Sequence, residues 1–283
     1  MTSKKTDMID VPGARLYYEL YGEPTDTTRP LLMIPGGLGD AAFFSSAGPA
    51  LGTDRLVVAY DRRGNSRSIL TSENADLSVP RNADDAIALL DALGIDRADV
   101  FGGSGGAVIA LDVAARYPDR VATMVSHEPP VVALLPDGAA LHAELEEVHA
   151  IYRTEGAEQA MEAFQASYAG GDEQDFVFDP ELPADPAIGT RFMGNVDVLL
   201  GRELLTFVEF EPDLDALKAA ATSGTRLLFG GGVLSKAHYP SRSGAALADL
   251  LGAEFVDFPG DHAGYLGRPR AFADRLREVL AAG

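Results

Sequence analysis

A serine flanked by glycines is the residue with the clearest chemical meaning in this chain of 283 residues. Ser104 lies in the run Gly102-Gly103-Ser104-Gly105-Gly106, after an apolar run at 98–101 and before a small-residue helical pattern at 107–111. A sharp strand-to-helix turn with this pattern projects the hydroxyl for nucleophilic attack, and its glycines let strand and helix approach closely. The alternative is a glycine-rich connection without chemistry, because the chain has 30 glycines.

The surrounding pattern predicts alternating strands and helices. Short apolar runs are typical of strands buried on both faces, and longer periodic runs are typical of helices. Strands are expected at 14–21, 30–34, 55–60, 98–103, 121–126, 225–229 and 254–258, and helices at 80–93, 105–117, 242–251 and 268–281. This alternation predicts an α/β fold with a mostly parallel, doubly wound sheet. Because ligands bind at the carboxyl ends of such strands, Ser104, the Gly36-Gly37 turn and His127-Glu128 should share one crevice.

Residues 129–221 break the alternation. Helical patterns at 138–155, 157–169 and 186–208 follow one another without a buried strand between them. We therefore expect a helical lid at 129–221, inserted into a core made of residues 1–128 and 222–283. Most of its large apolar side chains should form the lid core, with two or three lining a pocket; they are Phe164, Phe176, Phe178, Phe192, Met193, Phe207 and Phe210.

Composition limits the partners and the location. The formal net charge of −20, from 43 acidic and 23 basic residues, disfavours nucleic acids and anionic membranes, since both bind clustered positive charge. The absence of cysteine excludes disulfides and thiolate metal sites. No apolar segment follows Lys4 and Lys5, and no apolar run is long enough to span a membrane, so we expect a soluble cytoplasmic protein. The oligomeric state stays open, with a homodimer as one option.

Several motifs, in their order along the chain, resemble those of the α/β-hydrolase superfamily over nearly the whole length. They are Pro35-Gly36-Gly37, Asp61-Arg62-Arg63-Gly64 with Ser68, the turn at 102–106, Glu211-Pro212-Asp213 at the end of the lid, and Pro259-Gly260-Asp261-His262. The resemblance implies Ser104 as nucleophile and His262 as general base, because a serine hydroxyl needs an adjacent base to attack. Of the other histidines, His142 and His149 are expected to be solvated, and His127 and His238 stay open as pocket residues.

The acid that orients the base is the departure from this resemblance. In the superfamily it usually follows the strand that ends here at Phe229, but the segment 230–235 has no carboxylate. Some members place the acid one strand earlier, where this chain has Glu128. We predict Glu128 as the acid, since the order Ser104, Glu128, His262 matches the order of the superfamily. Two alternatives stay open: Glu128 anchors the hinge of the lid, or Asp261 is the acid.

The remaining parts of the site are backbone groups and two arginines. An oxyanion hole needs two N–H donors, and the candidates are those of Gly37 and Gly105. Arg62 and Arg63 are expected to tie their loop to neighbouring carbonyls, with binding of a substrate carboxylate as the alternative. The chain has neither a metal-binding nor a phosphate-binding motif, so no metal and no cofactor are expected.

Together these assignments predict a cofactor-free serine hydrolase that cleaves a carboxylic ester or lactone of a moderately apolar small molecule through an acyl-enzyme. Serine at position 104 argues against the aspartate chemistry of epoxide hydrolases and dehalogenases in this superfamily. Two alternatives come from other classes. One is a tailoring enzyme of secondary metabolism that catalyses cyclisation, acyl transfer or C–C hydrolysis. The other is a non-catalytic ligand receptor, suggested by the missing carboxylate after Phe229.

Overall fold

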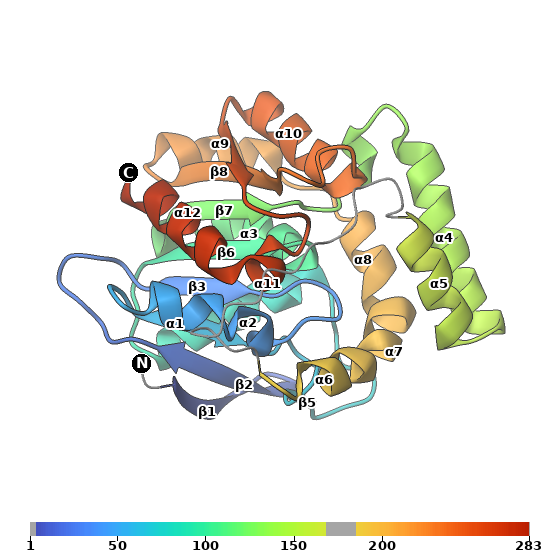
Figure 1. Cartoon of the computed structure of the whole chain (residues 1–283), viewed down its shortest axis with the longest axis horizontal. Helices are drawn as coiled ribbons and strands as arrows, with labels where there is room; N and C mark the ends of the chain where they lie inside the picture. Colours follow the sequence, from blue (N-terminus) through green and yellow to red (C-terminus); the bar gives the residue numbers. More distant parts are fainter. Residues whose placement is uncertain (1–3, 168–184, 283) are drawn as a thin grey trace.

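A nine-stranded sheet forms the centre of the computed structural model, which describes residues 4–167 and 185–282 (Figure 1). Its strands are β1 (Lys4–Val11), β2 (Ala14–Tyr21), β3 (Leu31–Ile34), β4 (Val57–Tyr60), β5 (Ile69–Leu70), β6 (Ala98–Gly103), β7 (Val121–His127), β8 (Arg226–Gly232) and β9 (Glu254–Phe258). The order across the sheet is β1-β2-β4-β3-β6-β7-β8-β9, and β5 pairs with β2. From β4 to β9 all neighbours in this order are parallel, which confirms the predicted α/β sheet.

The sequence prediction missed β1, which forms an antiparallel hairpin with β2. Seven of its eight residues are exposed or only half-buried, so the segment has no apolar run that would mark it as a strand. The missed strand lies at the edge of the sheet, far along the strand order from β6 and β7. It therefore contributes nothing to the placement of Ser104.

Helices cover both faces of the sheet, as expected for a doubly wound fold. The helices α2 (Val79–Ala92), α3 (Gly105–Arg116), α9 (Leu214–Thr222) and α10 (Tyr239–Leu251) pack into one apolar cluster. The opposite face is covered by α1 (Ala47–Leu51) and α12 (Pro269–Ala281), together with the short turns η1 (Ala41–Phe44) and α11 (Gly264–Gly267). Two further turns, η2 (Pro118–Arg120) and η3 (Val132–Leu134), flank β7. Within residues 4–167 and 185–282, no helix combines the length and the apolar character that crossing a membrane requires.

The chain between β7 and β8 forms a group of helices on the side of the sheet opposite the two chain ends (Figure 1). They are α4 (Gly138–Thr154), α5 (Ala157–Ser167), α6 (Ile188–Gly194), α7 (Val196–Val198), the π-helical turn η4 (Leu199–Glu203) and α8 (Leu204–Val208). The single helix expected at 186–208 is thus broken, and it turns at Asn195, whose side chain hydrogen-bonds loops of the core. The lid boundaries 129–221 stay a prediction. Within them, α9 packs against α3 and α10, which belong to the layers over the sheet.

The large apolar side chains of the lid differ in their environment. Phe207 is buried, whereas Met193 is 66% exposed. Phe164, Phe192 and Phe210 are partly buried against the core cluster. The two remaining phenylalanines of the predicted set, Phe176 and Phe178, lie outside the described residues.

His127, at the end of β7, is part of an aromatic cluster rather than of a pocket wall. It is fully buried, and its ring lies 5.3 Å from the Phe258 ring and 5.4 Å from the Phe272 ring, both in edge-to-face geometry. The backbone of Asp261 and His262 lies near the imidazole of His127. The two ring nitrogens of His127 nevertheless complete no hydrogen bond of normal geometry with the described residues. Burial lowers the pKa of His127 to about 4, so the ring is neutral at neutral pH.

This environment predicts a pH-dependent loss of stability. Between pH 6.5 and about 4 the unfolded chain binds a proton at His127 that the folded protein excludes, so the free energy of unfolding falls as the pH falls. The difference between the pKa of His127 in the unfolded and in the folded protein corresponds to about 3 kcal/mol of stability. In His127→Phe, which matches the aromatic surroundings, this contribution should disappear. Urea unfolding of both proteins from pH 7 to pH 4 measures the difference, and parallel curves would contradict a neutral, buried His127.

Candidate active site

Ser104 lies at a sharp turn between β6 and α3. Its backbone is in the left-handed region, with φ 55° and ψ −122°, which is unusual for a residue with a side chain and is typical of strained functional turns. The turn is held in place by a 2.9 Å hydrogen bond from Ser104 N–H to the carbonyl of His127 on the neighbouring strand. The serine is half-buried, and thus accessible from one side.

The glycines around Ser104 are required by close packing. A Cβ on Gly102 would lie 2.1 Å from the carbonyl oxygen of Gly106, and a Cβ on Gly106 would lie 2.2 Å from that of Ile34. Real side chains do not tolerate such distances, so β6, α3 and the end of β3 can meet only if both residues lack a side chain. This explains why the pattern that singled out Ser104 in the sequence contains glycine on both sides.

Glu128 follows β7 directly and also has a positive φ, of 52°. Its carboxylate is fully buried and faces the loop after β9, where its Oε2 lies 2.6 Å from Nδ1 of His262. Its other oxygen, Oε1, accepts hydrogen bonds from the backbone N–H of Gly232, at 2.7 Å, and from the hydroxyl of Ser235. The structure therefore places a carboxylate at the end of β7, beside the turn that carries Ser104, and this carboxylate is in direct contact with an imidazole.

These contacts keep the Glu128 carboxyl ionised. Burial by itself would raise its pKa, but the hydrogen bond and charge of His262 and the hydrogen bond from the Ser235 hydroxyl outweigh this effect, and the pKa of Glu128 lies below its ordinary value. An ionised carboxylate at Nδ1 favours the tautomer in which that nitrogen carries the proton. In that tautomer the other ring nitrogen, Nε2, is left as the basic atom.

The segment after β8 supports Glu128 instead of supplying an acid itself. A Cβ on Gly232 would lie 2.5 Å from the backbone of Asp261, so the end of β8 can touch the loop of His262 only at a glycine. Ser235 lies in the segment where the resemblance to the superfamily implies a carboxylate, and its hydroxyl donates to Glu128. The carboxylate of Asp261, by contrast, accepts the N–H of Ala263 and stabilises its own turn.

Gly105 directly follows Ser104, and Gly37 follows Gly36, which packs against Ser104. Gly105 is the first residue of α3, and a Cβ on the neighbouring Gly36 would lie 2.7 Å from Cβ of Ser104. Within the described part of the chain, the N–H groups of Gly37 and Gly105 have no hydrogen-bond acceptor. Two N–H groups beside a serine hydroxyl could together bind a negatively charged oxygen.

The lid covers both of these glycines. A Cβ on Gly37 would lie 2.6 Å from Cδ1 of Leu199, and a Cβ on Gly105 would lie 2.6 Å from Cε2 of Phe207. Leu199 is in η4 and Phe207 is in α8, and both side chains are buried. Two apolar side chains of the lid thus pack directly against the two glycines whose N–H groups are the candidate donors. The sequence contained no signal that would have selected these two from the other apolar residues of the lid.

Arg62 and Arg63 are both buried and both make structural contacts. Arg62 donates from Nε to the carbonyl of Pro35 and from Nη2 to that of Gly36, each at 3.0 Å. Arg63 forms two hydrogen bonds of 2.6 Å with the carboxylate of Asp85. Their contacts agree with the expected role of tying loops together, and neither guanidinium is exposed to a substrate carboxylate.

Both histidines of α4 were expected to be solvated, but His149 instead makes a structural contact. His149 Nδ1 lies 2.7 Å from the carbonyl oxygen of Leu200 in η4, which ties α4 to the turn. His142 lies between two carboxylates, 3.4 Å from Glu146 and 3.4 Å from Glu209. The atoms of these three side chains that could bind a metal ion lie within 4.8 Å of one another. The glutamates are exposed, so solvated polar contacts are a sufficient account of this group. His238, half-buried, immediately precedes α10.

The sequence of this chain matches a known protein family. Residues 29–161 match the family model described as the alpha/beta hydrolase fold. The chain is 34% identical to a protein of Bacillus subtilis (strain 168) named uncharacterized hydrolase YraK, over 96% of this chain and 94% of that protein.

Solved structures agree in fold. An enol-lactonase from Burkholderia xenovorans LB400 has a TM-score of 0.66 at 20% identity, covering 97% of this chain and 100% of its own. A proline iminopeptidase from Mycobacterium smegmatis has a TM-score of 0.67 at 19% identity, covering 98% of each chain. At these identities the likeness shows the fold alone, and the two names differ in the bond that is cleaved.

Proposed function

Because this chain belongs to the α/β-hydrolase family, we propose that it is a serine hydrolase that cleaves a carboxylic ester or lactone. The observation that carries the proposal is the 2.6 Å contact between Glu128 Oε2 and His262 Nδ1 beside the strained turn of Ser104. The hydrolase names of the relatives support the general class. The assignment of a serine mechanism, and of an ester or lactone as the bond that is cleaved, is inferred from the residues of the site.

In the proposed mechanism Ser104 attacks the substrate carbonyl while His262 takes the hydroxyl proton at Nε2. The imidazolium that forms is stabilised by Glu128, and the negative charge on the carbonyl oxygen is stabilised by the N–H groups of Gly37 and Gly105. His262 then returns the proton to the departing alkoxide, and an acyl-enzyme remains on Ser104. Water, activated by the same imidazole, releases the carboxylic acid.

The contacts of Glu128 favour catalysis over a ligand receptor. The receptor hypothesis arose from the missing carboxylate after Phe229, and Glu128 supplies a carboxylate in contact with the imidazole from the preceding strand. The same contacts argue against a role limited to the lid hinge, because Oε2 faces His262 and Oε1 faces Gly232 and Ser235. Asp261, the other candidate acid, is hydrogen-bonded within its own turn.

The nucleophile can be tested without knowing the natural substrate. A fluorophosphonate should label Ser104 stoichiometrically, because phosphonylation follows the same attack as acylation. Labelling and hydrolysis of p-nitrophenyl acetate should both be lost in Ser104→Ala, with an unchanged circular dichroism spectrum. Mass spectrometry of the intact protein and of its peptides locates the adduct. A folded wild-type protein that remains unlabelled would exclude the serine mechanism.

The acid can be tested with Glu128→Gln. The glutamine oxygen should keep the bonds from Gly232 and Ser235, which turns its NH₂ group toward Nδ1 of His262 and stabilises the wrong tautomer. We expect kcat for p-nitrophenyl acetate to fall by about 10³–10⁴-fold. The matched control is Asp261→Asn, which alters the neighbouring carboxylate and should retain activity within about threefold. A larger loss in Asp261→Asn than in Glu128→Gln would transfer the role of acid to Asp261.

The packing of Leu199 on Gly37 predicts the acyl preference. Leu199→Ala should enlarge the space beside Gly37 and raise kcat/KM for p-nitrophenyl hexanoate relative to the acetate by about 10-fold, since one or two methylenes in an apolar pocket change specificity by this amount. Leu145→Ala makes the same truncation at a buried position on α4 and should leave the ratio unchanged. Equal ratios in the two variants would remove Leu199 from the acyl pocket.

A further inference from the structure

A buried ion pair joins the lid to Arg62, in the loop that follows β4. Arg62 and Glu203 are both fully buried and are in contact through two pairs of atoms, Nη1 with Oε1 and, at 3.0 Å, Nη2 with Oε2. Glu203 is the last residue of the π-helical turn η4, and π-helical turns occur frequently at functional sites. Asn65 adds a longer hydrogen bond of 3.3 Å to Oε1. The lid is therefore attached to the core by charge as well as by apolar packing.

The same guanidinium holds the carbonyl groups immediately before Gly37. Its Nε donates to Pro35 and its Nη2 donates to Gly36. The carbonyl of Gly36 and the N–H of Gly37 belong to one planar peptide group, so fixing the direction of the first fixes the direction of the second. A hydrogen bond to the carbonyl also polarises the peptide and strengthens its N–H as a donor.

We propose that Glu203 is a positioning residue for the oxyanion hole. By holding Arg62, the lid residue Glu203 fixes the peptide between Gly36 and Gly37, and the N–H of Gly37 then points at the developing oxyanion. The inference rests on the proposed serine hydrolase mechanism and extends it, because the donor site becomes complete only when η4 is docked. Arg62 acts through the peptide and does not touch the substrate.

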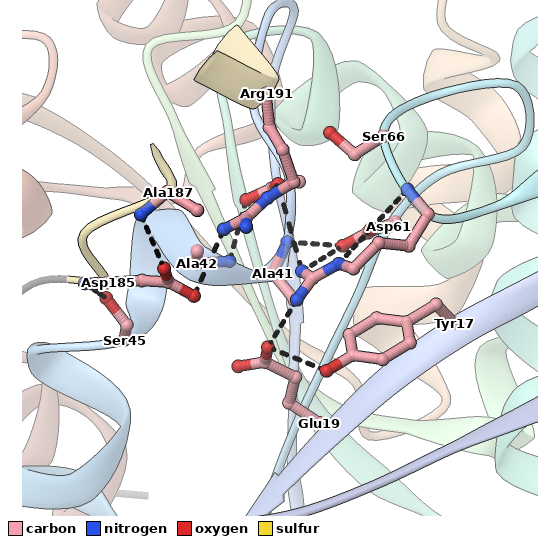
Figure 2. A network of polar contacts seen from close by, with 12 residues as sticks. Tyr17, Glu19, Ala41, Ala42, Ser45, Asp61, Ser66, Asp185, Ala187 and Arg191 are labelled. Carbon is pink, nitrogen blue, oxygen red and sulfur yellow. Dashed lines mark hydrogen bonds and ion pairs between the residues drawn. The ribbon is translucent and has the colours of Figure 1, made fainter. Parts of the chain in front are cut away.

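Other contacts of the lid reach the same loop at neighbouring positions. Asn195 donates to the carbonyl of Leu38 at 3.0 Å and accepts the N–H of Ser66 at 2.8 Å, and Leu38 and Ser66 both have positive φ values. Two residues further along the loop, Asp40 pairs with Arg191 of α6. Figure 2 shows Arg191 in a polar network with Asp185 and Asp61 around the start of η1. The lid thus binds this loop directly at Leu38 and Asp40, and it reaches Gly36 through Arg62.

The neighbouring pair Arg63–Asp85 offers a matched control. It is also buried and bidentate, but the other donors of Arg63 go to the carbonyls of Pro12 and Asp76, away from Gly37. Neutralising the acid in either pair leaves a buried arginine without its counter-charge and should destabilise the protein. Both variants should therefore lose stability, whereas only the variant at Glu203 should lose stabilisation of the oxyanion.

The experiment compares Glu203→Gln with Asp85→Asn. For each we measure the melting temperature, kcat and KM for p-nitrophenyl acetate, and the inhibition constant of an aryl trifluoromethyl ketone, whose adduct with serine carries an oxyanion. Glu203→Gln should lower kcat by about 10–100-fold with KM within about threefold, and should weaken the ketone by a similar factor. Asp85→Asn should lower the melting temperature but leave kcat and ketone binding within about threefold.

A second variant covers the case in which Glu203→Gln does not fold. Arg62→Lys keeps the positive charge beside Glu203 but loses the fork that reaches Pro35 and Gly36, so kcat and ketone binding should fall in the same way. Wild-type kcat in Arg62→Lys or Glu203→Gln, or an equal fall in Asp85→Asn, would overturn the positioning role. Failure of the proposed function would be seen earlier and separately, as a wild-type protein that neither hydrolyses the ester nor reacts with a fluorophosphonate.

Discussion

The buried carboxylate of Glu128 is the group on which the arrangement of the site depends. A carboxylate taken out of water must be compensated by donors, and here they come from the end of β8, from Ser235 and from the loop after β9. The donors Gly232, Ser235 and His262 lie 104, 107 and 134 residues after Glu128 in the sequence. Satisfying one charged group therefore brings together the ends of two strands and the loop that carries His262.

The position of Glu128 follows from how the strands end. Ser104 and Glu128 follow the adjacent parallel strands β6 and β7, and each has a positive φ that turns the chain sharply at the edge of the sheet. A hydrogen bond from Ser104 N–H to the carbonyl of His127 joins these two turns. Because the buried carboxylate follows β7, the end of β8 can consist of glycines, and Gly232 touches the backbone of Asp261.

The lid contributes more than a cover. Leu199 and Phe207 pack on the two glycines beside Ser104, while the polar residues Asn195 and Glu203 bind the loops that shape the same place. The alternation of apolar and charged contacts along 195–207 gives this segment a defined docking position. A purely apolar surface would permit sliding, whereas buried hydrogen bonds with fixed geometry specify one arrangement. In the proposed mechanism, substrate shape and oxyanion stabilisation both depend on this lid segment.

The sequence by itself determined the sheet, the order of its main elements and the candidates Ser104, Glu128 and His262. These are local or ordered signals: buried strands appear as apolar runs, and the sharp turn at Ser104 needs glycines nearby in the chain. The edge strand β1, the break at Asn195 and the contacts of Arg62 with Glu203 had no such signal. Only the tertiary structure decided which carboxylate meets His262, that His127 lies among aromatic rings, and which lid side chains cover Gly37 and Gly105. The physical reason is that each of these depends on contacts between residues far apart in the chain, and periodicity and composition describe only near neighbours.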